Sequence, residues 1–170
     1  MSNASQHIEL LIQREFWTKA REIIRIELGK DPKNHWLLTR LSSTYYEERR
    51  YKTALTFSKK ARRIAPNCPL VIWDYACSLD MLGREKSAIN LWKKLVDRGE
   101  RSIAFDECGE GLRWARSLIN DCYFRIGESY YDIRSESLAR SFIRKHLRGR
   151  KSGLPSLYEV KKIREHFPEI

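Results

Sequence analysis

The sequence contains no uninterrupted apolar run long enough to cross a bilayer, and it does not begin with a basic segment followed by an apolar one. A transmembrane helix needs about 20 consecutive apolar residues, and a secretory leader needs a basic and then an apolar stretch. We therefore expect neither a membrane span nor a signal peptide. The sequence predicts a cytoplasmic protein that does not use a membrane as a partner.

Cysteine occurs only four times, as Cys68, Cys77, Cys108 and Cys122, without a CxxC pair or a regular spacing. Reduced thiols are the default for such a pattern. The histidines stand far from the cysteines along the chain, whereas zinc sites usually place their ligands in closely spaced pairs. We therefore expect no metal site and no cofactor. The hydrophobic content of 42% can build a core without either.

The sequence also lacks a recognisable set of catalytic residues. Gly109 and Gly111 flank Glu110, but this stretch has neither the length nor the lysine of a phosphate-binding loop. Asp106, Glu107 and Glu110 offer carboxylates for acid–base chemistry, yet three such groups in a polar stretch are usually just solvated. Because function is argued from a site and no site is visible, we predict that the protein is not an enzyme.

A repeat is present instead. Ala20, Ala54 and Ala88 follow one another at a spacing of 34 residues, and Pro32 and Pro66 are separated by the same distance. A period of this size is typical of stacked helix-turn-helix units.

The clearest unit lies between His35 and Pro66 and has two amphipathic halves. Apolar and small residues in each half recur at three- and four-residue spacing, which places them on one face of a helix. These residues are Leu38, Leu41 and Tyr45 in the first half and Tyr51, Ala54, Leu55, Ser58 and Ala61 in the second. The small side chains of Ala54 and Ala61 predict that the two helices approach closely.

This unit resembles the tetratricopeptide repeat, whose signature is a large apolar residue, leucine, a small residue, tyrosine, alanine, an aromatic, alanine and proline. Those places are taken by Leu38, Leu41, Ser42, Tyr45, Ala54, Ser58, Ala61 and Pro66. The next unit continues the register through Ile72, Tyr75, Ala76, Leu79, Gly83, Ala88, Trp92, Leu95 and Glu100. Partial matches are Trp17, Ala20, Ile24 and Pro32 before these units, and Tyr123, Ile126, Gly127, Tyr130, Ala139, Ile143 and His146 after them. His146 stands where the family usually has alanine.

The resemblance implies an all-α protein, a right-handed superhelical solenoid of antiparallel helix pairs with a C-terminal capping helix and about nine helices. We divide a single domain, 1–170, into a degenerate repeat at 5–34, repeats at 35–68 and 69–102, an insertion at 103–119, a degenerate repeat at 120–153 and the capping helix at 154–170.

Several element boundaries follow from local sequence. Gly29 is expected to end a helix, residues 99–111 to form a loop, and a long helix to run from about Leu112 to about Tyr131. A final helix is expected over 155–167, with Leu157, Val160, Ile163 and Phe167 on the face that covers the last repeat.

In the family that this chain resembles, the first helix of each unit lines a concave groove that binds peptides or partner proteins. The resemblance implies that the groove is lined by Trp36, Thr39, Arg40, Ser43, Tyr46, Trp73, Asp74, Cys77, Phe124, Arg125 and Glu128. Aromatic and arginine side chains are the usual anchors of a protein interface. The alternative for Trp36 and Trp73 is packing beneath a neighbouring repeat. The basic and asparagine residues with which some members of the family hold chaperone tails are absent, which argues against that function.

The net charge of +11 suggests an alternative function. Basic residues crowd two of the predicted second helices and would form a basic face of Lys59, Lys60, Arg62, Arg63, Arg140, Arg144 and Arg148. Such a face could bind nucleic acid or an acidic partner, but cations near helix C-termini are also favourable without a ligand. We therefore favour a protein-interaction adaptor and keep a nucleic-acid-associated or acidic-partner-binding accessory protein as the alternative.

Overall fold

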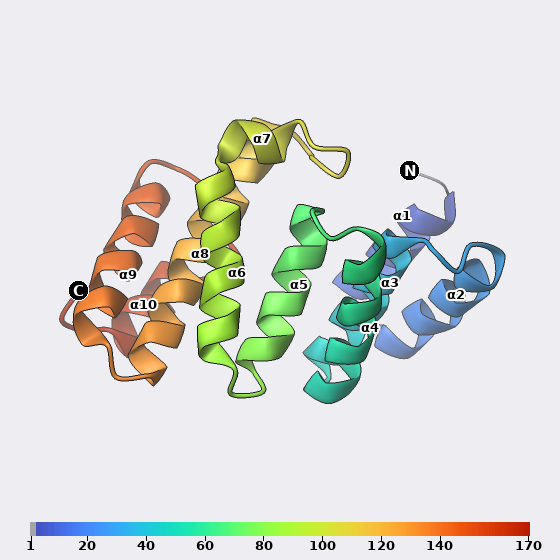
Figure 1. Cartoon of the computed structure of the whole chain (residues 1–170), viewed down its shortest axis with the longest axis horizontal. Helices are drawn as coiled ribbons and strands as arrows, with labels where there is room; N and C mark the ends of the chain where they lie inside the picture. The colour runs from blue at the N-terminus through green and yellow to red at the C-terminus, as the bar shows by residue number, and fades with distance from the viewer. Residues whose placement is uncertain (1–2) are drawn as a thin grey trace. The chain divides into compact units, whose positions relative to one another are not determined.

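The computed structural model describes residues 3–170, which form ten α-helices and no strand (Figure 1). This confirms the all-α prediction. None of the helices in these residues combines the length and the apolar character that a membrane-spanning helix needs. The chain divides into two compact units, of which the first ends at Leu82 and the second begins at Gly83.

The first unit is built from α1 (Asn3–Gln13), α2 (Trp17–Lys30), α3 (His35–Glu47), α4 (Tyr51–Ile64) and α5 (Pro69–Asp80). Helices α1 and α2 form one antiparallel hairpin and α3 and α4 a second, and α5 packs on both α3 and α4 (Figure 1). One core cluster joins the two hairpins and consists of Ile8, Ala20, Ile24, Leu37, Leu41, Tyr45 and Ala54. Ala54 and Ala61 are fully buried, which confirms that small residues occupy the inner face of α4.

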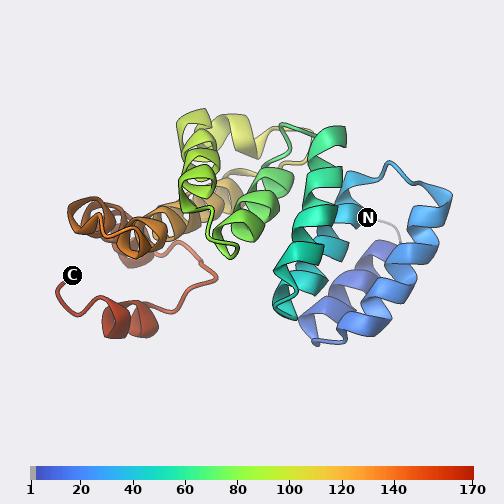
Figure 2. The ribbon, with the colours of Figure 1, turned by 60° about the horizontal axis from the view of Figure 1, so that its bottom comes forward.

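The second unit contains α6 (Glu85–Arg98), α7 (Glu100–Ala104), α8 (Leu112–Asp132), α9 (Glu136–Lys151) and α10 (Val160–His166). Helices α8 and α9 form a long hairpin, and α6 and α7 both pack on α8. At the crossing of the hairpin, Gly127 faces Ile143 so closely that a Cβ on the glycine would be 2.8 Å from the Ile143 side chain. Figure 2 shows α10, in red, beside this hairpin.

The turns of the α1–α2, α3–α4 and α8–α9 hairpins, and the link between α5 and α6, each contain one residue in the left-handed region. Glu15, Arg49 and Arg134 have φ angles of 61°, 58° and 59°, and Gly83 has a φ angle of 71°. After Arg49, the N–H of Arg50 donates to the carbonyl of Tyr45 at 2.9 Å, the five-residue return that closes a Schellman motif. Glu15, Arg49 and Gly83 stand at the same 34-residue spacing as the alanines. Only Gly83 could be identified as a turn residue from its type.

Two boundary predictions were wrong. Helix α2 continues through Gly29 to Lys30. The segment expected to be a loop contains α7, because Ile103 and Ala104 are buried and α7 packs on α8. The predicted long helix is confirmed as α8, so the last part of the expected insertion is helical.

The terminal helix is shorter than expected and does not include Pro155. Instead, residues 154–158 hydrogen bond to the α8–α9 hairpin. The Ser117 hydroxyl donates to the Pro155 carbonyl at 2.8 Å, and the Leu157 N–H donates to the Asp121 carboxylate at 3.1 Å. These bonds hold the segment in a non-helical conformation, and the Leu157 side chain is 77% exposed rather than part of a packed face.

Candidate functional site

The first residue of the site is Arg40, which lies on α3 in the first unit. Its Nε is 2.7 Å from Oε1 of Glu9, so the ion pair ties α3 to α1. The Arg40 guanidinium also lies over the ring of Trp36, 5.3 Å from the ring centroid. Trp36 is one turn earlier on α3 and is half-buried. Together these contacts hold the arginine in one position, although both partners remain partly open to solvent.

Helix α5 also contributes to the site, through Asp74. Its Oδ2 is shielded from solvent and makes no hydrogen bond within residues 3–170. Burial raises the pKa of Asp74 to about 7, the charge of Arg40 opposes that rise, and the charge of Glu47 adds to it. A carboxyl group with a shielded and unused acceptor atom therefore lies in the electrostatic field of Arg40.

The remaining residues of α3 on this side are Ser43, Tyr46 and Glu47. The Ser43 hydroxyl donates to the Arg40 carbonyl at 2.9 Å. The ring of Tyr46 meets that of Tyr51 edge to face, with centroids 5.3 Å apart. Burial raises the pKa of Glu47, and the charge of Glu15 raises it further. We name Glu9, Trp36, Arg40, Ser43, Tyr46, Glu47 and Asp74 the α3 surface.

Three residues that were predicted to line the groove of the first unit are buried instead. Thr39 is 1% exposed, and its hydroxyl donates to the Trp36 carbonyl at 2.7 Å. Trp73 and Cys77 on α5 are 9% and 7% exposed. For Trp73 the alternative of packing is therefore the correct one, and Trp36 also packs in part against the core cluster of the first unit while it stays partly accessible.

Phe124 and Arg125, which were predicted to line the groove in the second unit, are not on an open surface either. Phe124 is packed with Ile143, Ile163 and Phe167, and its ring centroid is 4.1 Å from that of Tyr158. The terminal segment therefore covers this part of α8.

Arg125 is 7% exposed, so it too differs from the prediction. Its guanidinium lies 5.2 Å from the ring centroid of Trp92 on α6. Its Nη1 is 2.7 Å from Oε2 of Glu128, which is half-buried. This arginine therefore joins α6 to α8 inside the second unit.

A buried polar cluster beneath the terminal segment was missed by sequence reasoning. Nδ1 of His146 is 2.8 Å from the Asn120 carbonyl oxygen and 3.1 Å from Nδ2 of the same residue. The carboxylate of Asp121 accepts hydrogen bonds from the Ser156 hydroxyl and the Leu157 N–H. The packing at His146 is thus well defined, since the imidazole is fully buried.

The same cluster contains shifted pKa values. Burial raises the pKa of Asp121, although the bonds from Ser156 and Leu157 and the charge of Arg150 act against the rise. Burial lowers the pKa of His146. The only sequence signal was His146 in a place where the family usually has alanine. Asn120 and Asp121 would be assigned to a solvated helix face from their types alone.

The basic residues are split between the two units. On α4, Lys59, Lys60 and Arg63 are exposed, and Arg62 lies over the ring of Tyr75, 4.7 Å from its centroid. On α9, Arg144 and Arg148 are exposed, whereas Arg140 pairs with Glu136 at 3.5 Å and with Glu169.

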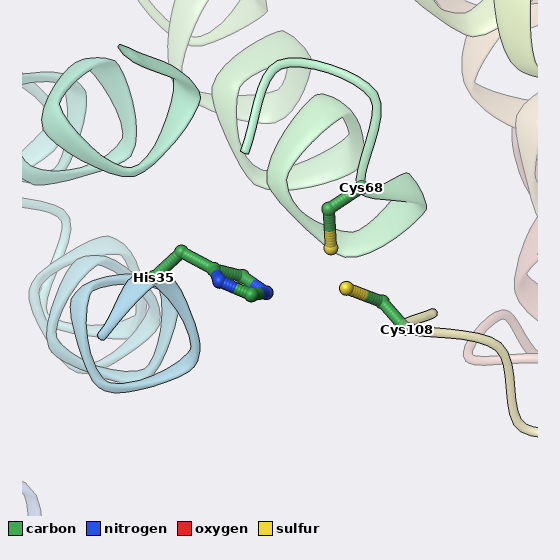
Figure 3. Close-up of side chains that lie close together, drawn as sticks. All are labelled: His35, Cys68 and Cys108. Atoms are coloured by element: carbon green, nitrogen blue, oxygen red, sulfur yellow. The ribbon is translucent and has the colours of Figure 1, made fainter. Parts of the chain in front are cut away.

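His35 and Cys68 lie close together although they are distant in sequence. His35 begins α3 and Cys68 precedes α5, and a ring nitrogen and the thiol sulfur are within 4.8 Å of each other (Figure 3). A structural zinc ion needs four ligands, so this pair alone is not a metal centre. Cys108, drawn in the same figure, belongs to the second unit.

Comparison with known proteins supplies no family assignment. No family model matches the chain, and no curated protein matches it. Several solved structures are similar. MamA MSR-1 C2 has 20% identity and a TM-score of 0.59, with 84% of this chain and 72% of that chain covered. MamA AMB-1 P212121 has 19% identity and a TM-score of 0.59, with 94% and 75% covered.

A third similar structure is YrrB, described as a TPR protein with an unusual peptide-binding site. It has 15% identity and a TM-score of 0.50, with 86% of this chain and 84% of that chain covered. At such low identities the similarity shows the fold alone. The chain has a tetratricopeptide-like fold of helix pairs, as the sequence predicted.

Proposed function

We propose that this protein is a non-catalytic recognition module whose α3 surface binds a segment of a partner protein, with Asp74 holding a basic side chain of that segment. The observation that carries the proposal is the unused hydrogen-bond acceptor of Asp74. A buried polar group without a partner is costly to leave unpaired, typically by about 1 to 3 kcal/mol. A lysine or arginine from a ligand would supply the missing charge, and it would also donate to Oδ2 if the Asp74 side chain turned toward the ligand.

The charge of the α3 surface supports a basic ligand. It contains the carboxyl groups of Glu9, Glu47 and Asp74 against one cation, Arg40. Arg40 is already paired with Glu9. The surface is therefore acidic in a chain whose net charge is +11, and a basic segment would be attracted to this place in preference to the rest of the molecule.

The aromatic residues supply the apolar part of the contact. Trp36 and Tyr46 are half-buried and are fixed by their contacts with Arg40 and Tyr51. Rigid, partly exposed aromatic rings lose little entropy on binding and are common hot spots of interfaces. Peptide binding is also a property of the similar structure YrrB, by its description, which supports a recognition role on this fold.

The test is selection of binding peptides from a random displayed library. We expect the enriched peptides to share a lysine or arginine at one position. Their affinity for the Asp74→Asn variant should fall about tenfold, because that variant loses the charge of a close ion pair. Tyr46→Ala should also weaken them. The matched control is Glu22→Gln, which removes an exposed carboxylate from α2 and should leave the affinity unchanged.

The pH dependence gives a second readout. A bound cation favours the ionised form of Asp74, so binding should release a proton from a carboxyl group whose pKa is about 7. The affinity should therefore rise as the pH increases through neutrality, and Asp74→Asn should abolish this rise. Enriched peptides without a common basic position, or with the same affinity for Asp74→Asn, would overturn the proposal.

A further inference from the structure

The second unit has a cleft between α9 and α10 that is independent of the α3 surface. Its volume is about 670 Å³, and its floor includes the aliphatic side chains of Leu147 and Val160. Five cationic side chains line it, namely Arg144, Arg148, Arg150, Lys151 and Arg164. Among residues 3–170, no acidic and no aromatic residue lines it.

Four of the five cations of this cleft are available to a ligand, whereas Arg150 donates a hydrogen bond to the Leu154 carbonyl. Arg144, Arg148, Lys151 and Arg164 are exposed. Within residues 3–170 the nearby carboxylates pair with other cations: Glu159 is 3.0 Å from Lys162, Glu165 is 4.0 Å from Lys161, and Glu169 pairs with Arg140. The positive charge of the cleft is therefore not neutralised by the terminal segment that forms one of its walls.

Helix dipoles account for only part of this arrangement. Arg148, Arg150 and Lys151 lie in the last turn of α9, where cations are favourable without a ligand. Arg144 is outside that turn, and Arg164 comes from α10. Arg144, Arg148 and Lys151 also follow one another at four- and three-residue spacing on one side of α9, facing the same cleft as Arg164. Cationic side chains from two helices thus line the same cleft as the aliphatic residues Leu147 and Val160.

We infer that this cleft is a second binding site, and that its occupant is an acidic peptide segment with an aliphatic side chain. Carboxylates of the segment would pair with the arginines, whose guanidinium groups suit bidentate contact with carboxylates. The aliphatic side chain would cover Leu147 and Val160. Single-stranded nucleic acid is the weaker fit, because its binding sites usually stack bases on aromatic side chains and this cleft has none.

The test uses a short fluorescent peptide in which glutamate alternates with leucine, and measures its binding to the full chain by anisotropy. The variant Arg148→Glu/Arg164→Glu reverses one charge on each helix of the cleft. We expect its affinity for the peptide to fall at least about tenfold, because charge complementarity becomes repulsion. Both residues are exposed, so the helical circular dichroism spectrum should not change.

The control variant Lys59→Glu/Arg63→Glu changes the net charge by the same amount on exposed residues of α4. It should retain nearly all of the affinity. Equal losses in the two double variants would show that the peptide responds to net charge only, and would overturn the site. A second peptide with serine in place of leucine should bind more weakly. Equal binding of the two peptides would show that Leu147 and Val160 do not contact the ligand.

A single-stranded oligothymidine of similar charge distinguishes the other class of ligand. Its binding should be weaker than that of the peptide at moderate salt. If the oligothymidine bound more tightly than the peptide, and Arg148→Glu/Arg164→Glu abolished that binding, the cleft would be a nucleic-acid site and not a peptide site. The site is independent of the proposed function, because its probe is acidic and its variants lie in the second unit, whereas the α3 surface is tested with basic peptides and variants of the first unit.

Discussion

Gly149 of α9 lies so close to Asn120 of α8 that a Cβ built on the glycine would be 2.1 Å from Oδ1 of the asparagine. No side chain can be accommodated at that distance without a shift of the asparagine. The glycine therefore leaves the space in which Asn120 is fully enclosed and reaches the imidazole of His146. One missing side chain thus permits the buried polar cluster of the second unit.

This contact predicts opposite effects for the same substitution at two helical glycines. Gly149→Ala should destabilise the protein by roughly 1 to 3 kcal/mol, because overpacking outweighs the better helix propensity of alanine. Gly29 of α2 has no atom within 4 Å of an added Cβ, so Gly29→Ala is the control. It should stabilise by up to about 1 kcal/mol. Urea unfolding midpoints measure both, and a midpoint for Gly149→Ala at or above the wild-type value would contradict the described crossing.

A second prediction concerns Ala54, which is fully buried where α4 meets the core of the first unit. Its carbonyl also accepts a hydrogen bond from the Ser42 hydroxyl at 2.9 Å. Ala54→Leu should lower the free energy of unfolding by roughly 1 to 3 kcal/mol through overpacking. Thr56→Leu adds a leucine to an exposed position of the same helix and should change stability little. Equal effects of the two substitutions would show that Ala54 is not at a tight contact.

The terminal segment supplies a third prediction. Ile163 is 3% exposed and packs with Phe124 and Phe167, whereas Leu157 is 77% exposed. Ile163→Ala should reduce stability by about 2 to 5 kcal/mol, because it opens a cavity in a packed cluster. Leu157→Ala should have an effect of less than about 0.5 kcal/mol. Thermal unfolding of the two variants checks this ranking. If Ile163→Ala were as stable as wild type, the segment would not contribute to the fold.

The carboxyl group of Asp74 predicts a pH dependence of stability. Its pKa is about 7 in the folded protein against 3.8 for an ordinary aspartate. Between these values the folded protein keeps a proton that the unfolded chain has released, so this group lowers stability as the pH rises through that range. Asp74→Asn removes the effect and should be more stabilising, relative to wild type, at about pH 8 than at about pH 5. Urea unfolding at both pH values measures the difference, and the same difference at both would mean that Asp74 ionises normally.

The register of small residues was predictable because it reflects local geometry. Ala20, Ala54 and Ala88 are all buried. Ala20 and Ala54 lie in the second helices of the two hairpins of the first unit, where a small side chain lets the helices approach closely. The left-handed turns at Glu15, Arg49 and Arg134 were not predictable, since these residue types rarely adopt that conformation. At these positions the geometry of the hairpin requires a positive φ angle, whichever residue type is present.

The candidate site could be predicted only in part. Trp36, Arg40, Ser43, Tyr46 and Asp74 are partly accessible, as a groove requires. Thr39 and Cys77 belong to the same helices but are buried. Adjacent helical positions differ by about 100° in direction, so the angle at which neighbouring helices cross decides which of them stays open.

By itself, the sequence determined an all-helical chain with a 34-residue repeat and a terminal apolar segment, because the spacing of apolar and small residues sets which face of each helix must be buried. Tertiary structure alone decided that residues 154–158 are not helical and hydrogen bond to Asp121, that Phe124 and Arg125 are covered, and that Asp74 keeps an unused acceptor. Each of these depends on atoms brought together from helices distant in sequence, and the periodicity of one helix carries no information about them.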